Sequence, residues 1–404
     1  MDTGYGALLR TPGVARIIAA QLAARFPSGM LSLGLLFHVQ RTTGAYAAAG
    51  VVLAALSIGQ AVAGPAMGRL MGRLGIRQVV LLAASLCAAC VAAIALAPLP
   101  LPAVVVLALL AGLSFPPITS AVRTIYPKLV NARLLSPLFS LDASLQELIW
   151  IGGPVAVTFV ATSVSTSIGL LLSVALLLGG GLWFAASPEV ARVRIPRSRR
   201  RFGAVLGRPT VLLATLIGFL LIASCAAVEA SVPGAFGTDD PISGVVLAVW
   251  SLASLAGGFA LGRLPIGPWA LPARLIIVVA GLALTPFVSG FWALSGALVL
   301  SGFGLAPALG VLSTTVSSTV KFSDTAEAYG WTNTGQLVGV ALGAALAGQL
   351  LDRQGPAAAF GSGALLACVA TLTAAVATRW QPDLRGRDVG PIPDTGSITQ
   401  PTRG

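Results

Sequence analysis

The stretch Gly64-Pro-Ala-Met-Gly-Arg-Leu-Met-Gly-Arg-Leu-Gly-Ile-Arg77 separates two long apolar runs, and basic charge first concentrates there. Its small residues allow tight turns and close helix approach. Arg69, Arg73 and Arg77 recur every four residues, which suits a surface that faces lipid phosphates or helix C-termini. Alone, the stretch predicts a basic turn between two membrane spans. Its further significance depends on whether the chain repeats it.

The composition indicates a membrane protein. Of 404 residues, 56% are hydrophobic and only 9% are charged, whereas soluble domains carry roughly 25% charged residues. The four cysteines lie in apolar runs without a second pair or a neighbouring histidine, so we interpret them as packing residues and expect no metal and no cofactor. The sequence contains no Walker loop and no assembled nucleophile–base constellation, so we expect neither ATP hydrolysis nor an enzyme.

Twelve stretches approach the roughly 20 apolar residues that cross a bilayer. They cover residues 14–38, 45–67, 78–97, 102–124, 137–161, 165–186, 209–231, 241–262, 272–289, 291–315, 328–350 and 357–378. The predicted fold class is therefore all-α and integral to the membrane. We divide the chain into an N-terminal six-helix bundle (1–186), an arginine-rich linker (187–208), a C-terminal six-helix bundle (209–378) and a disordered tail (379–404).

The basic residues predict the orientation. With the N-terminus inside, almost every Lys and Arg falls on the cytoplasmic side, as the positive-inside rule requires. Both termini are then cytoplasmic in a multi-pass protein of the cell membrane. The net charge of +12 follows this topology and lacks the basic–aromatic pattern of nucleic-acid binding, so we expect no nucleic-acid partner.

The stretch is repeated. Ala49-Gly-Val-Val-Leu-Ala-Ala-Leu-Ser57 resembles Ser243-Gly-Val-Val-Leu-Ala-Val-Trp-Ser251, and Gly64-Pro-Ala-Met-Gly-Arg-Leu70 then aligns with Gly258-Phe-Ala-Leu-Gly-Arg-Leu264. At a slightly smaller offset, Ala111-Gly-Leu-Ser-Phe-Pro-Pro117 aligns with Ser301-Gly-Phe-Gly-Leu-Ala-Pro307, Gln146 with Gln336, and Gly153 with Gly343. Two halves in the same orientation indicate a parallel repeat about an axis along the membrane normal.

With this repeat, the chain resembles the major facilitator superfamily of secondary transporters, and within it the bacterial efflux permeases. The region with Gly64, Gly68, Arg69, Arg73, Gly75 and Arg77 looks like the family's signature loop between spans two and three. Gly72 stands where the family usually has an acid, and Ala108 where its span-four motif has an arginine. Gly153-Pro154 resembles the helix-packing core of the antiporter motif. The resemblance implies two rocking bundles whose spans one, four, seven and ten line a central cavity.

Ionisable side chains within spans are costly and need an explanation. Glu147 lies near the predicted midplane, where desolvation favours its protonated form, and is our first candidate for proton coupling. Glu229 lies late in span seven. Arg25, beside Pro27, Ser28 and Gly29 that loosen the helix, either ties helices together or binds an anionic group. An ion pair of Arg25 with Glu229 or Glu147 is either broken during transport or permanent.

Helical spacing places Asp142 and Gln146 on one face of span five and Glu147 on another. We interpret Asp142 as structural, paired with Lys128 or Arg133. Arg123 we expect to extend to lipid phosphates. Four candidates for contact with a substrate remain, and the span-eleven residues among them could equally bind neighbouring helices: Gln146, Trp331, Asn333 and Gln336.

These observations predict a monomeric secondary transporter in the lipid bilayer, whose partners are protons and a small-molecule substrate. Export of a small amphiphilic compound in exchange for protons is the preferred interpretation. It depends on Gly153-Pro154 and on a pathway with few polar groups. The alternatives are proton-coupled uptake of a nutrient, a transport-inactive scaffold or sensor and, least favoured, an embedded enzyme.

Overall fold

The computed structural model describes residues 5–198, 200–236, 242–386 and 389–394. Their helices are α1 (Tyr5–Arg10), α2 (Val14–Arg25), α3 (Pro27–Thr43), α4 (Tyr46–Leu74), α5 (Ile76–Leu96), α6 (Leu101–Leu113), α7 (Ile118–Leu129), α8 (Ala132–Ser163), α9 (Thr166–Ala186), α10 (Pro188–Arg192), α11 (Pro209–Phe236), α12 (Ile242–Leu261), α13 (Ala270–Leu282), α14 (Phe291–Thr319), α15 (Phe322–Gln354) and α16 (Pro356–Val376). Short 3₁₀ turns cover Ala204–Gly207, Thr285–Phe287 and Ala377–Trp380.

Within this described part of the chain, twelve helical segments are long and apolar enough to cross a membrane, so the prediction of twelve spans is confirmed. Several extend beyond the predicted limits: the second span reaches Leu74, and the eleventh begins earlier and ends later, at Phe322–Gln354. Large apolar side chains such as Leu82, Phe159 and Leu372 point away from the bundle and are about two-thirds exposed (65%, 68% and 65%). Such an apolar outer surface suits lipid.

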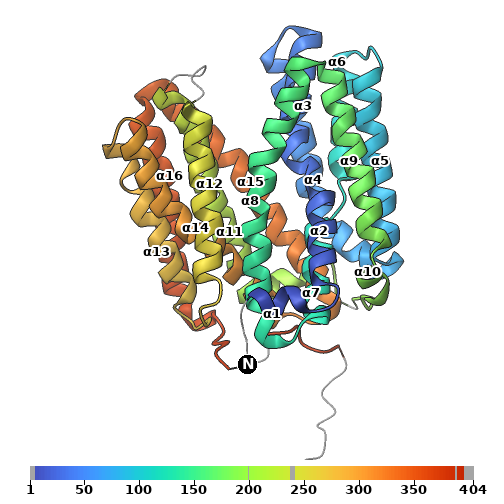
Figure 1. Cartoon of the computed structure of the whole chain (residues 1–404), viewed down its shortest axis with the longest axis vertical. Coiled ribbons are helices and arrows are strands. Elements are labelled where there is room, and N and C mark those ends of the chain that lie inside the picture. The colour runs from blue at the N-terminus through green and yellow to red at the C-terminus, as the bar shows by residue number, and fades with distance from the viewer. Residues whose placement is uncertain (1–4, 199, 237–241, 387–388, 395–404) are drawn as a thin grey trace, which may run out of the picture.

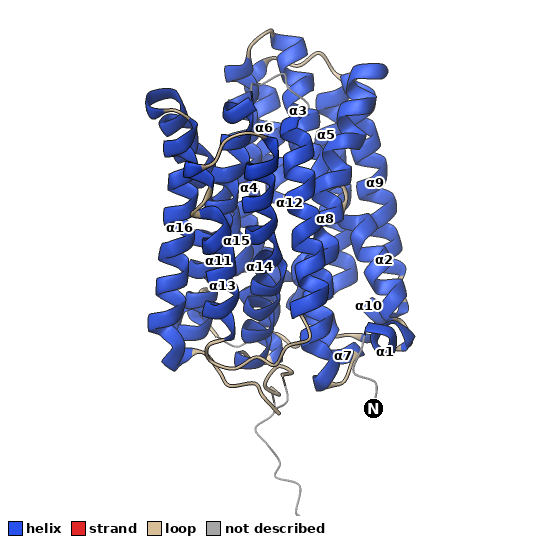
Figure 2. Ribbon diagram, turned by 60° about the vertical axis from the view of Figure 1, so that its left-hand side comes forward, coloured by secondary structure: helices blue, strands red, loops and turns tan. Residues whose placement is uncertain are grey.

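The helices form two bundles, α2–α9 and α11–α16 (Figures 1 and 2). The bundles meet through α4 with α15 and through α8 with α12 and α14. The end of the molecule that carries α7 and α10 is here called the basic end, because Arg73, Lys128 and Arg192 lie there. The bundles approach each other at the basic end and diverge toward the opposite end (Figure 1).

Glycines make the same helix contacts in both halves. A Cβ on Gly112 would lie 2.1 Å from the carbonyl oxygen of Leu56, and one on its repeat partner Gly302 would lie 2.6 Å from that of Trp250. A Cβ on Gly153 would likewise meet the backbone of Gly29. These distances are shorter than any real contact, so the backbones can approach this closely only without side chains. The repeat detected in sequence is therefore also a repeat of packing.

Spans one and four are broken at the centre of the first bundle. The first consists of α2 and α3, which meet at Phe26, and the Ser28 hydroxyl donates to the carbonyl of Arg25 over 2.6 Å. This agrees with the loosening predicted around Pro27. Span four stops at Leu113 and resumes at Ile118, because Pro116-Pro117 cannot supply the backbone N–H groups that a continuous helix needs. Broken spans are stable where they line a cavity.

The basic stretch itself is mostly helical, in contrast to the predicted loop. Helix α4 continues through Gly68 and Arg69 to Leu74, despite Pro65 within it. The turn is Gly75 alone, with φ of 92°, a conformation that favours glycine. Helix α5 begins directly after it at Ile76. The stretch therefore presents its arginines from a rigid helix end.

The described part of the tail contacts the start of α15. Backbone bonds join Ile392 N–H to the carbonyl of Val320 (2.9 Å) and Phe322 N–H to the carbonyl of Ile392 (3.0 Å). The Asp394 carboxylate accepts from Ser323 N–H (3.2 Å) at the start of α15. Val389 is buried. The tail thus covers the start of α15; residues 387–388 and 395–404 lie outside the described residues.

Adding a methyl group to Gly343 tests the packing between α11 and α15. A Cβ there would lie 2.0 Å from the carbonyl oxygen of Ala223, so we expect Gly343→Ala to lower stability by about 1–3 kcal/mol, as overpacking does. On the same helix, Gly348 has open space around it, and Gly348→Ala should be neutral or stabilising by up to about 1 kcal/mol. Thermal unfolding in detergent, followed by circular dichroism, would measure both; equal unfolding temperatures would contradict the packing.

Candidate substrate cavity and coupling site

A cavity of about 390 Å³ lies where the breaks in spans one and four face each other. Its wall comes from α2, α3, α4, the α6–α7 connection, the start of α7, α8 and α15. Most of the lining is apolar, with hydroxyl and amide groups from Ser32, Ser57, Gln60 and Asn333. Among the described residues that line it, Arg25 alone is charged. Spans one and four line it, whereas no described lining residue comes from span seven (α11) or span ten (α14), so the expectation that all four spans line the cavity is met only in the first bundle.

Arg25 is held at the cavity by side chains from its own helix, α2, and from α8. It is 6% exposed. Its Nη1 donates to Gln21 Oε1 (2.8 Å) and to Asp142 Oδ1 (3.0 Å), and its Nη2 donates to Gln146 Oε1. Asp142 and Gln146 therefore lie on the same face of α8, as the helical spacing predicted. Gln146, which also lines the cavity, fixes the guanidinium at its edge.

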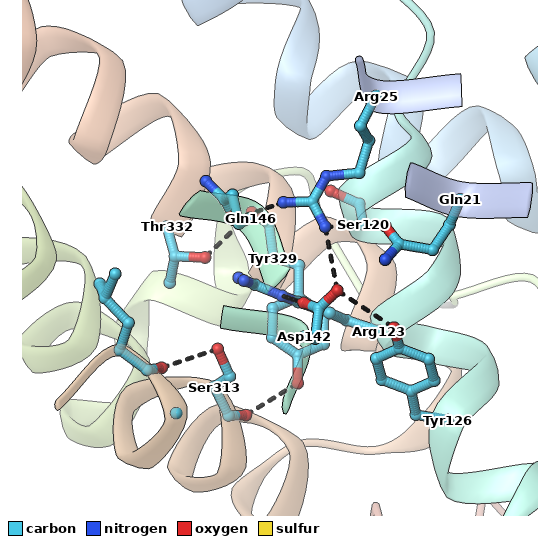
Figure 3. Close-up of polar contacts among 12 residues, drawn as sticks. Gln21, Arg25, Ser120, Arg123, Tyr126, Asp142, Gln146, Ser313, Tyr329 and Thr332 are labelled. Atoms are coloured by element: carbon cyan, nitrogen blue, oxygen red, sulfur yellow. Dashed lines mark hydrogen bonds and ion pairs between the residues drawn. The ribbon is translucent and has the colours of Figure 1, made fainter. Parts of the chain in front are cut away.

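Asp142 is fully buried and is shared by two arginines (Figure 3). Besides Arg25, Arg123 Nε donates to its Oδ2 (3.1 Å), and the Tyr126 hydroxyl donates to its Oδ1 (3.1 Å). Arg123 also lies over the ring of Tyr329, 5.9 Å from its centroid. Two buried cations thus share one carboxylate, a strong arrangement only while every partner is present.

Three expectations about these charges are wrong in this structure. Asp142 pairs with Arg25 and Arg123 instead of Lys128 or Arg133. Arg123 is buried, at 8% exposure, and does not extend to lipid phosphates. Arg25 pairs with Asp142, not with Glu147 or Glu229. The physical reason is the break at Pro116-Pro117, which starts a new helix, α7, and directs Arg123 toward α8.

Glu147 lies on the other side of α8 from the cavity and contacts the second bundle. It is 8% exposed, and its Oε1 accepts a hydrogen bond from the Ser254 hydroxyl of α12 (2.8 Å). Glu229 of α11 lies near enough for its charge to act on Glu147, although its side chain is exposed. In the described chain neither carboxylate has an arginine or lysine partner, whereas Asp142, Glu189, Asp324, Glu327 and Asp383 each have an arginine.

The four predicted substrate contacts separate into two groups. Gln146 and Asn333 line the cavity. Trp331 lies outside the lining and stacks at a tilt against Phe202 of the linker, with ring centroids 5.7 Å apart. Gln336 also lies outside and packs beside Gly218 of α11. Sequence reasoning missed Ser120 and Thr119, which line the cavity at the start of α7; the Pro116-Pro117 pair was the available signal.

At the basic end, Arg69 of the basic stretch links the first bundle to α15 and to the linker. Arg69 Nε donates to Glu327 Oε2 of α15 (2.8 Å) and its Nη2 to the carbonyl of Arg200 in the linker. Gly203 N–H donates to the other oxygen of Glu327 (2.8 Å). Arg69 therefore pairs with an acid of the second bundle. Gly72 itself lies against the linker, where a Cβ would be 3.3 Å from the carbonyl oxygen of Pro196.

Small residues of α4 bring the two bundles together at the same end. A Cβ on Gly68 would lie 2.4 Å from the carbonyl oxygen of Ala326, and one on Gly64 would lie 3.1 Å from that of Gly330. The Thr334 hydroxyl donates to the carbonyl of Ala61 (2.6 Å). These contacts lie between the cavity and the basic end, so they separate the cavity from that end.

A protein-family profile matches the sequence of this chain, and solved structures match its fold. The Major Facilitator Superfamily profile matches residues 17–284 and 226–401. The chain belongs to the Major Facilitator Superfamily. No curated protein sequence matches it. Membership in the superfamily indicates a multi-pass membrane transporter rather than an enzyme.

Two solved structures resemble this superfamily member along nearly its whole length. The human organic anion transporter MFSD10 (TETRAN) matches with a TM-score of 0.70 and 17% identity, over 90% of this chain and 98% of that one. A bacterial homologue of the iron transporter ferroportin in its outward-facing state matches with a TM-score of 0.70 and 14% identity, over 91% and 98%. At these identities the likeness shows the fold alone.

The shared carboxylate predicts an asymmetry between variants of this transporter. Asp142→Asn leaves two buried cations without an anion, so we expect a loss of about 3–5 kcal/mol of stability. Arg25→Met leaves Asp142 paired with Arg123 and Tyr126, and should cost less. Thermal unfolding in detergent measures both. An equal or greater loss for Arg25→Met would contradict the role given to Asp142.

Removing the charge of Glu327 should loosen the basic end. Glu327→Gln loses the ion pair with Arg69 that joins the two bundles, so the population open at that end should rise. A cysteine at position 334, where Thr334 contacts α4, reports this through labelling by a maleimide that cannot cross membranes. Labelling should be faster in Thr334→Cys with Glu327→Gln than in Thr334→Cys alone. Asp383→Asn, at an exposed pair with Arg385, is the control and should not change the rate.

Proposed function

We propose that this protein is a proton-coupled secondary transporter that exports a small amphiphilic compound by alternating access. One observation carries the proposal. Glu147 is a buried carboxylate without a cationic partner in the described chain, and it bonds Ser254 across the junction of the two bundles. A buried carboxylate without a counter-ion is stable when protonated. Movement of the bundles would break the contact with Ser254 and change the proton affinity of Glu147.

The orientation follows from charge and closure. We place the basic end, and with it both termini, in the cytoplasm of a cell-membrane protein, in accordance with the positive-inside rule. The pair Arg69–Glu327 and the packing of α4 on α15 then close the cytoplasmic side. In the proposed cycle, this arrangement is the state in which the cavity communicates with the exterior and Glu147 takes up a proton. Rocking of the bundles would then present the cavity and Glu147 to the cytoplasm.

Two observations favour export of an amphiphilic compound. The cavity wall is mainly apolar, with scattered hydroxyl and amide groups, which suits an amphiphile better than a sugar. Gly153 packs against Gly29 at the junction of α8 with α3, in the segment that resembles the antiporter motif. Proton-coupled uptake uses the same parts in the reverse direction and is the second candidate. Glu229, near Glu147 on the other bundle, is proposed as an accessory proton site.

The decisive experiment compares wild type with Glu147→Gln in proteoliposomes under an imposed pH gradient. Fluorescein and rhodamine 123 share a ring system but differ in charge, and serve as amphiphilic probes. We expect wild type to move at least one of them in response to the gradient. Glu147→Gln, which cannot exchange a proton, should lose the gradient-driven component by about a hundredfold, the low end for positioned acid–base groups.

Asp352→Asn is the matched control, because it removes an exposed carboxylate at the far end of α15 and should transport like wild type. Equal gradient-driven transport in wild type and Glu147→Gln would overturn the coupling assignment. Probe movement in the direction of the protons would favour uptake. Absence of probe transport by folded wild-type protein would support the scaffold alternative instead.

A further inference from the structure

We propose that the cavity selects an anionic amphiphile, whose carboxylate, sulfonate or phosphate group binds between Arg25 and the start of α7. This inference names the substrate class for the site of the proposed transport and rests on that proposal. It depends on three features of the described residues: the charge balance around Asp142, the unused donors of Arg25, and the free backbone groups at the break in span four.

The charge balance at the cavity is positive. Arg25 and Arg123 share the single carboxylate of Asp142. With two cations and one anion, the buried cluster has a net charge of +1. Glu147 does not offset it, because that side chain lies on the other side of α8, against Ser254. Among the described residues, no acid lines the cavity. A cationic solute would therefore meet uncompensated repulsion there, and an anion would complete the pairing.

Arg25 has donors left for a ligand. A guanidinium carries five N–H groups, and three of them serve Gln21, Asp142 and Gln146. The other two have no partner within the described chain, although the side chain is only 6% exposed and borders the cavity. A ligand oxygen in the cavity would accept charge-assisted hydrogen bonds from these remaining donors.

The start of α7 adds a second group of donors. Its backbone N–H groups at Thr119 and Ser120 have no acceptor among the described residues, and both residues line the cavity. Helix N-termini carry a partial positive charge and bind anions. Arg25 and this helix start border the same cavity, which also offers apolar wall from Leu31, Phe115 and Leu337. The combination of positive donors with an apolar wall matches an anion on a hydrophobic body.

A pair of probes with one body and opposite charges tests this assignment. Naphthalene-2-sulfonate and 2-naphthylmethylammonium would be titrated into the full chain in zwitterionic lipid nanodiscs, with isothermal titration calorimetry and empty nanodiscs as the blank. We expect saturable binding of the sulfonate and at least about tenfold weaker binding of the ammonium compound, the order that one charge-assisted hydrogen bond supplies. Similar affinities for the two, or no saturable sulfonate binding at millimolar concentration, would overturn the proposal.

Variants locate the site. Arg25→Met should weaken sulfonate binding by about tenfold or more, while Arg25→Lys, which keeps the charge, should recover part of it. Arg133→Met removes the same charge from an exposed position of α8 and should bind like wild type. Loss of sulfonate affinity in Arg133→Met to the extent seen in Arg25→Met would show that net charge alone is responsible, which would overturn the assignment. Wild-type discrimination between the two probes remains decisive if Arg25→Met does not fold.

Glu147→Gln separates this proposal from the proposed function. The variant should keep wild-type affinity for the sulfonate, since Glu147 does not line the cavity. Intact sulfonate binding together with unchanged gradient-driven transport would sink only the coupling role of Glu147. Loss of charge discrimination together with Glu147-dependent transport would sink only the anion assignment.

Discussion

The buried carboxylate of Asp142 is the interaction on which the first bundle depends. It receives Arg25 from α2, Arg123 and Tyr126 from α7, and so joins spans one, four and five at the point where two of them are broken. Each break leaves backbone groups without helical partners. The ion cluster fixes the pieces beside the cavity. Replacing the cluster with apolar side chains could preserve stability but would remove the charge from the cavity.

The acids of the chain divide by their partners. Asp142 is held by cations within one bundle, and Glu327 and Asp324 hold α15 to Arg69 and Arg200 at the basic end. These pairs set structure and closure. Among the described residues, Glu147 accepts a hydrogen bond from the Ser254 hydroxyl, which belongs to the other bundle. A carboxylate whose hydrogen-bond partner moves with the opposite bundle is sensitive to conformation in a way that a carboxylate held by arginines is not.

Much of the fold could be predicted from sequence, because spans, repeats and breaks are local properties. The length of the apolar runs predicted the twelve spans, and Pro27 predicted the break in span one. The two registers of the repeat predicted that Gly112 and Gly302 make equivalent contacts. Helical spacing also separated Gln146 from Glu147. The partners of Asp142, Arg69 and Glu327 could not be predicted, since each depends on how distant helices are placed. The tail shows the same limit: its composition resembles a disordered segment, yet Ile392 pairs with backbone at the start of α15.

The separation of Gln146 from Glu147 has an energetic consequence for coupling. Although they are neighbours in sequence, Gln146 lines the cavity and Glu147 lies at the bundle junction. Cargo and proton would therefore occupy different sites and could be bound together or in turn. If the cargo is a monoanion that leaves while one proton enters, each cycle transfers the equivalent of two positive charges inward. An inside-negative membrane potential favours that exchange by roughly 2.3 kcal/mol per charge for each 100 mV, in addition to the pH gradient. Uptake of the same anion with one proton would move no net charge. The cargo charge that Arg25 selects therefore determines whether the membrane potential adds to the pH gradient. Arg25 itself need not move.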